Sequence, residues 1–316
     1  MIKEFKDKTA LITGAASGLG LEFSRRALGL GMNLIMIDIK DDQLQQASMD
    51  INHDGNSSPS KIKCYSVDVS SASEMQSLAD RIRDQHDTPS LVINNAGVSG
   101  GGLVWENSAK DWERVLGVNL MGVINGVRLF TPMMLEAAKR DPNWTGHIVN
   151  TASMAGLLTP PNMGIYNVSK HAVVALTETL YQDLALVSDQ VTASVLCPYF
   201  VPTSINQSFN ETHSRKSLNT DESINLLDVA TTFSQKIGKE MLDKAVNSGK
   251  VSAADVAIKV FDAIVQNQFY IFSHPKSLGN VQERMQAILD NKQPPNPFSK
   301  RPEIGEELKA ALRSAT

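Results

Sequence analysis

A tyrosine and a lysine stand one helical turn apart in the chain, at Tyr166 and Lys170. Side chains four residues apart meet on the same face of a helix, so this spacing brings a phenol next to an ammonium group. The unperturbed pKa of tyrosine is about 10, too high for a base near neutral pH. A neighbouring cation favours the phenolate and lowers that pKa. The pair is therefore suited to moving a proton to or from a substrate oxygen.

A hydroxyl group, that of Ser153, is placed to assist this proton transfer. Ser153 follows the apolar run 147–151, so it stands where a strand is expected to end. A hydroxyl there can hydrogen-bond a substrate oxygen and stabilise the negative charge that develops on it. Taken alone, a Tyr–Lys pair is an ordinary helix contact, and a serine after a strand is a common helix cap. It is the joint arrangement that predicts catalysis.

The segment 13–20 reads Thr-Gly-Ala-Ala-Ser-Gly-Leu-Gly and lies between an apolar strand-like run and a helix-like run. Its glycines free the turn from Cβ clashes, so backbone N–H groups and the positive end of the helix can approach phosphate oxygens. This arrangement predicts a site for the pyrophosphate of a dinucleotide. The residues assigned to it are Gly14, Ser17, Gly18, Leu19 and Gly20.

The choice of dinucleotide is argued from Asp38, which ends the second expected strand. A carboxylate there accepts hydrogen bonds from the adenosine ribose and repels a 2′-phosphate. The glycine turn contains no Lys or Arg, and Lys40 is expected to point away from the ribose. This favours NAD over NADP. A plainer interpretation is that Asp38 only begins a surface loop.

Two further motifs complete a pattern. Asn94-Asn95-Ala96-Gly97 follows the apolar run 91–93, and Asn119 lies in the next long helix-like segment. With the glycine turn, Ser153 and the Tyr–Lys pair, in this order and spacing, the chain resembles the classical short-chain dehydrogenases/reductases. The resemblance covers roughly residues 5–205.

The resemblance implies roles for individual residues. The implied catalytic residues are Asn119, Ser153, Tyr166 and Lys170, with Asn119 kinking its helix and holding a water that connects Lys170 to solvent. Asn125 is a nearby competitor for the position of Asn119. Tyr166 and Lys170 also count among the cofactor contacts. The other implied contacts are Asp68 and Val69 at the adenine, Asn95, Ala96 and Gly97 in the cleft, and Pro198, Val201 and Thr203 near the nicotinamide and pyrophosphate.

The substrate is expected to be bulky and apolar. The family usually shows Pro-Gly after the sixth strand, but here Tyr199 replaces the glycine and Phe200 follows. The segment 154–163, between Ser153 and Tyr166, contains no charged residue. A charged substrate normally needs Arg or Lys nearby. Aromatic and apolar residues are also ordinary packing, which is the alternative. The residues assigned to the substrate pocket are Met154, Leu158, Met163, Tyr199 and Phe200.

Strand-like and helix-like segments alternate along the chain, as in a single α/β domain of 1–316 with a doubly wound parallel sheet, the Rossmann fold. Strands are expected near 9–13, 33–38, 62–67, 91–94, 146–151, 191–197 and 269–272. Helices are expected near 18–31, 41–53, 73–86, 111–140, 165–188 and 252–267. Capping pairs are Ser73 with Gln76, Ser108 with Asp111, and Ser252 with Asp255.

Two segments extend this frame. Residues 204–250 are expected to form a helical lid that excludes water and sets specificity. Within them His213, Arg215 and Lys216 could reach an acidic tail of the substrate, although a solvated loop is the simpler interpretation. Residues 275–316 form a C-terminal arm with two apolar helical stripes, which docks on its own subunit or on a partner. The stripes are Leu278, Val281, Met285, Ile288 and Leu289, and then Ile304, Leu308 and Leu312.

Composition agrees with a cytoplasmic enzyme. The chain has 316 residues, 42% of them hydrophobic, and a net charge of −4 with no basic stripe for nucleic acid. Cys64 and Cys197 are expected to be buried thiols in a reducing compartment. No signal peptide, membrane span or metal-ligand spacing of histidines is visible.

These features together predict an NAD-dependent oxidoreductase that interconverts a bulky apolar secondary alcohol and its ketone. The expected assembly is a homodimer or homotetramer, with the helices near 111–140 and 165–188 pairing across a two-fold axis. An NADPH-dependent carbonyl reductase of similar substrates is the alternative. A nucleotide-sensing protein without catalysis is a further one, which the presence of Ser153, Tyr166 and Lys170 argues against.

Overall fold

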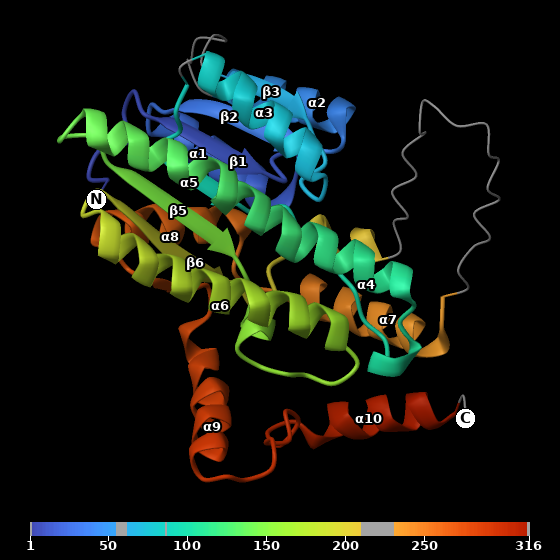
Figure 1. Ribbon diagram of the computed structural model, residues 1–316. Helices are drawn as coiled ribbons and strands as arrows, with labels where there is room; N and C mark the ends of the chain where they lie inside the picture. Colours follow the sequence, from blue (N-terminus) through green and yellow to red (C-terminus); the bar gives the residue numbers. More distant parts are fainter. Residues whose placement is uncertain (1, 55–61, 86, 210–230, 315–316) are drawn as a thin grey trace.

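The computed structural model describes residues 2–54, 62–85, 87–209 and 231–314. Its centre is a sheet of seven strands in the order β3-β2-β1-β4-β5-β6-β7, and each pair of neighbours is parallel. Helices cover both faces of the sheet (Figure 1). The order reverses between β1 and β4, which confirms the doubly wound Rossmann fold.

The strands agree closely with the expected ranges. They are β1 Thr9–Thr13, β2 Asn33–Asp38, β3 Ile62–Ser66, β4 Leu91–Asn94, β5 Gly146–Thr151, β6 Val191–Cys197 and β7 Tyr270–Phe272. The central strands β4 and β5 are buried along their whole length, because helices pack on both sides of them. Cys197 is buried as expected, whereas Cys64 is only half-buried on β3, which lies at the edge of the sheet.

The helices form two layers and an arm. They are α1 Gly18–Gly29, α2 Asp41–Asp54, α3 Ala72–Asp84, α4 Ala109–Leu116, α5 Gly122–Arg140, α6 Gly164–Val187, α7 Phe233–Asn247, α8 Ala253–Gln266, α9 Leu278–Leu289 and α10 Pro302–Arg313. Helices α1, α2 and α8 enclose the core on one face of the sheet, and α3, α5 and α6 enclose the core on the other.

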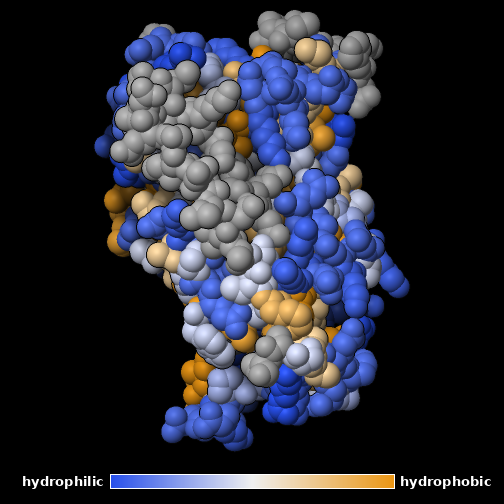
Figure 2. Space-filling view, turned by 90° about the vertical axis from the view of Figure 1, so that its right-hand side faces the viewer, coloured by the Kyte–Doolittle hydropathy of each residue, from blue (hydrophilic) through white to orange (hydrophobic). Residues whose placement is uncertain are grey.

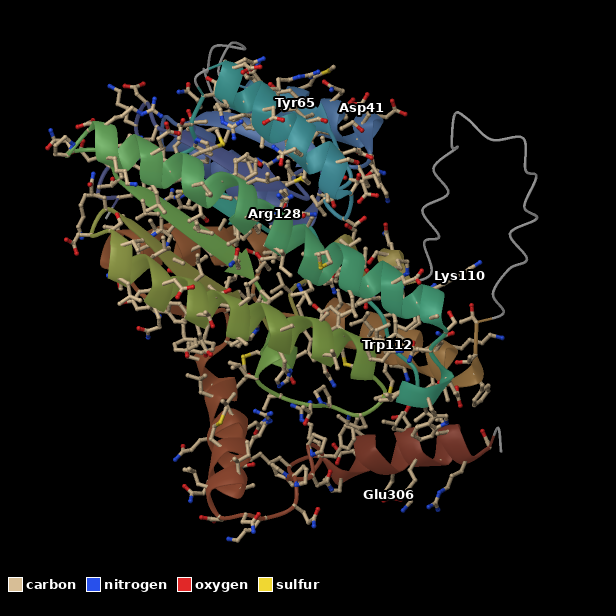
Figure 3. All side chains as sticks on the ribbon, viewed as in Figure 1. Asp41, Tyr65, Lys110, Trp112, Arg128 and Glu306 are labelled. Atoms are coloured by element: carbon tan, nitrogen blue, oxygen red, sulfur yellow. The ribbon has the colours of Figure 1, made fainter. Side chains whose placement is uncertain are left out.

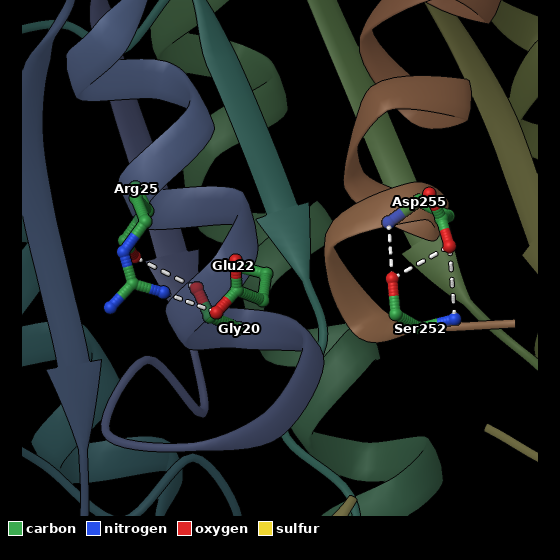
Figure 4. A network of polar contacts seen from close by, with 6 residues as sticks. Gly20, Glu22, Arg25, Ser252 and Asp255 are labelled. Carbon is green, nitrogen blue, oxygen red and sulfur yellow. Dashed lines mark hydrogen bonds and ion pairs between the residues drawn. The ribbon is translucent and has the colours of Figure 1, made fainter. Parts of the chain in front are cut away.

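Two of the three expected helix caps are confirmed. Ser108 and Ser252 each accept a backbone N–H and form complete capping boxes with their partners, as Figure 4 shows for Ser252 and Asp255. The third expectation, Ser73 with Gln76, is wrong. Helix α3 begins earlier, because the hydroxyl of Ser71 accepts the N–H of Glu74 at 3.3 Å.

One expected helix, near 111–140, is interrupted. Helices α4 and α5 are joined by a π-helical turn at Gly117–Met121. The continuous stretch Ala109–Arg140 is the one helix of the described chain long and apolar enough to cross a membrane by composition. Its buried residues, among them Phe130, Met133 and Met134, pack into the core against the sheet, as in the core helix of a globular protein.

The C-terminal arm (275–314 in the described part) leaves the lower edge of the sheet in Figure 1. None of the residues of α9, all of which the structure describes, is buried, and Ile288 and Leu289 are largely exposed. Helix α10 returns to the body and buries Leu308. Glu306 lies on its outer side, away from the body (Figure 3). Of the two apolar stripes, the first contacts the core of the body through the partly buried Val281, and only the second contributes a buried side chain.

Candidate active site

A cavity of about 1190 Å³ opens where the strands end. Parallel α/β sheets bind their ligands at this edge because the loops after the strands converge there. Nearly all of the sequence-predicted cofactor, catalytic and substrate residues line it. The two that do not are Gly20 and Asn119.

The glycine turn is shaped by close backbone contacts. Gly14 and Gly18 have positive φ angles of 66° and 54°. A Cβ on Gly20 would lie 2.0 Å from the carbonyl oxygen of Gly14, so only glycine lets α1 start against the turn. The Ser17 side chain caps none of the described N–H groups of α1. The helix start therefore presents backbone donors to the cavity, where Ser17, Gly18 and Leu19 line it.

Asp38 is tied to the same turn rather than to a free surface loop. Its carboxylate accepts the N–H of Ala16 at 3.1 Å and that of Lys40 at 3.1 Å. These bonds hold the carboxylate at the cavity rim, beside the end of β2. Lys40 lines the cavity as well, so its expected orientation away from the site is not supported.

Asn95 and Ala96 are fixed by Thr13, a residue that the sequence argument treated only as part of the motif. The Thr13 hydroxyl accepts the N–H groups of Asn95 at 2.9 Å and of Ala96 at 3.0 Å. The Asn95 amide donates to the carbonyl of Thr13 at 3.1 Å. These hydrogen bonds join the ends of β1 and β4, so the glycine turn 13–20 and the segment Asn94-Asn95-Ala96-Gly97 depend on each other for their positions.

Asn119 is fully buried on the π-helical turn. Its side chain accepts the N–H of Val98 at 2.8 Å and donates to the Val98 carbonyl at 3.0 Å and to the hydroxyl of Ser169 at 3.1 Å. The π turn lies where the resemblance implied a kink. The competitor Asn125 is occupied elsewhere, donating to the carbonyl of Val69 at 2.9 Å.

Ser153, Tyr166 and Lys170 meet in the cavity. Ser153 starts a short 3₁₀ turn after β5, and its hydroxyl is hydrogen-bonded to Tyr166. Lys170 Nζ lies 5.7 Å from the centre of the Tyr166 ring and donates to the carbonyl of Thr151 at 2.9 Å. Tyr166 and Lys170 are 9% and 2% exposed, so both polar groups work in a desolvated setting.

Burial dominates the pKa values of this group. It raises the pKa of Tyr166 to about 12, which the hydrogen bond from Ser153 partly opposes. Burial also lowers the pKa of Lys170 to about 8. The expectation that Lys170 lowers the phenol pKa is therefore not met in the protein by itself. The buried thiol of Cys197 lies beside Lys170, and burial raises its pKa to about 12, so it stays neutral.

The implied adenine and nicotinamide ends also line the cavity. Asp68 accepts from the N–H of Ser70 at 2.9 Å and from its hydroxyl at 2.6 Å. Thr203 packs against the glycine turn, since a Cβ on Gly18 would come within 3.2 Å of it. Val201 is buried beside the same turn and packs in the core under α1.

The substrate wall has the composition that the sequence suggests. Met154, Leu158 and Met163 line the cavity together with Tyr199 and Phe200, whose rings lie 4.5 Å apart. Tyr199 is 41% exposed, and its ring meets that of His274 edge-on at 5.8 Å.

The sequence argument missed the contribution of the C-terminal arm. Residues of α9 and α10 line the cavity, as does the segment 295–301 that precedes α10. The apolar periodicity of the arm indicated helices, but no local signal placed those helices over the substrate end. Helix α7, which lies within the expected lid 204–250, lines the cavity as well. Among the described residues no group of His, Cys, Asp and Glu is arranged to hold a metal ion.

Comparison with known proteins identifies the family of this chain. Residues 8–214 match the family described as short chain dehydrogenase. The chain belongs to the short-chain dehydrogenase family. It is an oxidoreductase of the NAD(P)-dependent dehydrogenase/reductase type.

Three individual proteins illustrate the likeness. A short-chain dehydrogenase/reductase from Burkholderia phymatum, solved in complex with NAD, is 42% identical, with a TM-score of 0.83 over 95% of this chain and 100% of that chain. The CLA biosynthesis dehydrogenase/reductase of Lactiplantibacillus plantarum is 29% identical over 93% of this chain and 97% of that protein. The 1-deoxy-11-beta-hydroxypentalenate dehydrogenase of Streptomyces exfoliatus is 28% identical over 98% and 96%.

Proposed function

We propose that this protein is an NAD-dependent oxidoreductase that interconverts a bulky apolar secondary alcohol and its ketone. The observation that carries the proposal is the meeting of Ser153, Tyr166 and Lys170 in the cavity that the glycine turn also lines. The Streptomyces relative is named a dehydrogenase of a hydroxy-substituted compound, which supports an alcohol as the group oxidised.

The residues present fit NAD. Gly14, Gly18 and Gly20 leave a cradle that side chains would fill, and the start of α1 offers backbone donors for a pyrophosphate. The Asp38 carboxylate at the rim suits ribose hydroxyls and repels an additional phosphate. The Burkholderia relative, solved with NAD, supports the same choice.

The protein side chains divide the chemistry. NAD⁺, when bound, accepts the hydride, and its positive ring favours the phenolate of Tyr166. Tyr166 takes the proton of the substrate hydroxyl in oxidation and returns it in reduction. Ser153 hydrogen-bonds the substrate oxygen and stabilises its developing charge. Lys170, with a pKa near 8, exchanges a proton near neutral pH, while Asn119 holds the helix turn that faces it.

The segment 204–250 serves in this proposal as a lid over the substrate, within a single domain of 1–316. Its described parts support this, because the 3₁₀ turn Ser204–Phe209 and α7 both line the cavity. The middle of the segment, including His213, Arg215 and Lys216, lies outside the described residues. Closing the cavity would exclude water from the proton transfer.

We further propose a homodimer or homotetramer in a reducing compartment such as the cytoplasm. Val168 and Leu186 lie on the same face of α6 and are 49% and 84% exposed, which supports pairing through this helix. The free thiols Cys64 and Cys197 fit a reducing setting. Light scattering on the purified protein measures the assembly, and a monomer at all concentrations would contradict it.

The decisive experiment supplies purified protein with NAD⁺ or NADP⁺ and a panel of apolar secondary alcohols, and follows reduced nicotinamide by absorbance. We expect turnover with NAD⁺ and a loss of about 10²- to 10⁴-fold in Tyr166→Phe, because the proton carrier is removed. Tyr65→Phe is the matched control, because the Tyr65 hydroxyl donates to Gln85 and neither residue lines the cavity. Faster turnover with NADP⁺ than with NAD⁺ would refute the role of Asp38 in cofactor choice, but it would leave the proton-transfer mechanism intact. Turnover that survives in Tyr166→Phe would refute the mechanism.

A further inference from the structure

The arm has a defined position at the substrate end of the cavity. Leu308 of α10 is buried, and Lys244 of α7 forms an ion pair with Glu307 at 3.3 Å. Lys300 donates to Asn280 at 3.0 Å and to Glu283 at 2.8 Å, which ties the segment before α10 to α9. Figure 3 shows side chains of this part of the arm pointing into the space between the arm and the body.

The charges that the arm brings to the cavity do not cancel. The carboxylates of Glu283 and Glu307 line the cavity but are paired with Lys300 and Lys244. Arg284 and Arg301 also line it, and neither has an ion-pair partner among the described residues. A half-buried Arg284 without such a partner is a cation that a bound anion can satisfy.

Arg301 is exposed and lines the same cavity as the aromatic wall of Tyr199 and Phe200. Its N–H donates to the carbonyl of Phe298 at 2.9 Å, and its own carbonyl accepts from Ile304 at 3.2 Å. Its charge acts on Tyr199, where it lowers the phenol pKa against the larger, opposite effect of burial. A guanidinium therefore stands at the substrate end, whereas the wall 154–163 carries no charge.

This juxtaposition selects a class of substrate. Guanidinium groups bind carboxylates through two parallel hydrogen bonds. Of the two arginines, Arg284 is half-buried and Arg301 is exposed. We propose that Arg284 and Arg301 bind the carboxylate of the substrate, which is a hydroxylated carboxylic acid with a bulky apolar body. The inference rests on the proposed function, because it names the substrate class of the same site.

The test uses two probes that share the same hydroxylated chain and differ at the carboxyl end: stearic acid with a mid-chain hydroxyl, which carries the negative charge, and its neutral methyl ester. With NAD⁺, we expect kcat/KM for the acid to exceed that for the ester by about tenfold or more, as a charge-assisted hydrogen bond allows. In the double variant Arg284→Gln/Arg301→Gln, kcat/KM for the acid should fall until its preference over the ester is lost. Lys309→Gln is the control, because Lys309 is an exposed cation of α10 that pairs with Glu306 and does not line the cavity. This variant should keep the preference for the acid.

Two outcomes overturn the anion site: equal use of both probes by the wild type, or a preference that persists in the double variant. Activity on the ester shows that the variant remains folded. Calorimetric titration of the NADH-loaded protein separates this inference from the proposed function. If neither probe is turned over, the proposed function fails for this class. Tighter binding of the acid than of the ester then still supports the anion site, and equal or absent binding refutes it.

Discussion

The cofactor end and the substrate end of the cavity are built in different ways. At the cofactor end, Gly14, Thr13 and Asn95 are fixed by close backbone contacts and by partly buried hydrogen bonds between neighbouring strands. At the substrate end, the arm is held by the buried Leu308, by the partly buried Val281 and by exposed ion pairs such as Lys244 with Glu307. Exposed ion pairs contribute little to stability. The comparison suggests a fixed cofactor site joined to an adjustable substrate site.

Among the variants that test this comparison, the largest effect is expected at Gly20, in the fixed cofactor end. In Gly20→Ala the new Cβ would lie 2.0 Å from a backbone oxygen, so the turn must shift. We expect NAD affinity to fall by more than about tenfold, with a loss of about 1–3 kcal/mol in the free energy of unfolding. Cofactor titration and urea unfolding measure both quantities.

Gly29→Ala in the same helix is the matched control for Gly20. Nothing lies within 4 Å of a Cβ at that position. Its cofactor affinity should equal that of the wild type. Equal behaviour of the two variants would mean that the turn is not the fixed structure described above.

A second variant sharpens the account of the cofactor end. Asp38→Ser removes the carboxylate that would face the ribose, so we expect the preference for NAD⁺ over NADP⁺ to drop by about tenfold or more. The ratio of kcat/KM for the two cofactors measures it. Asp42→Ser, an exposed acid of α2, should leave the ratio unchanged. An unchanged ratio in Asp38→Ser would assign cofactor choice to another residue.

A smaller effect is expected from loosening the adjustable end. Leu308→Ala removes the buried contact of α10, and burial losses of this kind cost about 2–5 kcal/mol in a full core. Since α10 is peripheral, we expect the substrate KM to rise while NADH affinity and the melting temperature stay near wild type. Hydrogen exchange should become faster in α10. An equal loss of NADH affinity would show that the two ends are not independent.

The last effect concerns Lys170, at the junction of the two ends, and changes only the pH dependence of the stability. Burial lowers its pKa from 10.5 to about 8, so between these values the folded chain binds fewer protons than the unfolded chain. The free energy of unfolding therefore increases as the pH rises through this window. Below the window, the full cost of burying the charged ammonium group lowers the stability. Lys170→Met should lack this gain, as urea unfolding at pH 8 and pH 10 tests. If the free energy of unfolding changed equally with pH in the wild type and in Lys170→Met, Lys170 would have to be solvated.

Most of the frame and the catalytic group could be predicted because their signals are local. Each strand is a short apolar run, and the Tyr166–Lys170 spacing needs only a helix to bring the two side chains together. The cap of α3 was misplaced from Ser71 to Ser73, because several serines there compete for the same role. The pKa of Tyr166 was expected to be lowered, but burial raises it, and a sequence motif does not show how deeply a side chain is buried.

The sequence by itself thus determined the family pattern, the doubly wound sheet and the residues that can move a proton, since each depends on neighbours a few positions away. Only the tertiary structure decided that α10 returns to the body, and that Arg284 and Arg301 line the cavity that also holds Tyr199. The physical reason is distance along the chain. The apolar periodicity of α9 and α10 predicts which face of each helix is buried, but it does not predict which distant surface that face packs against.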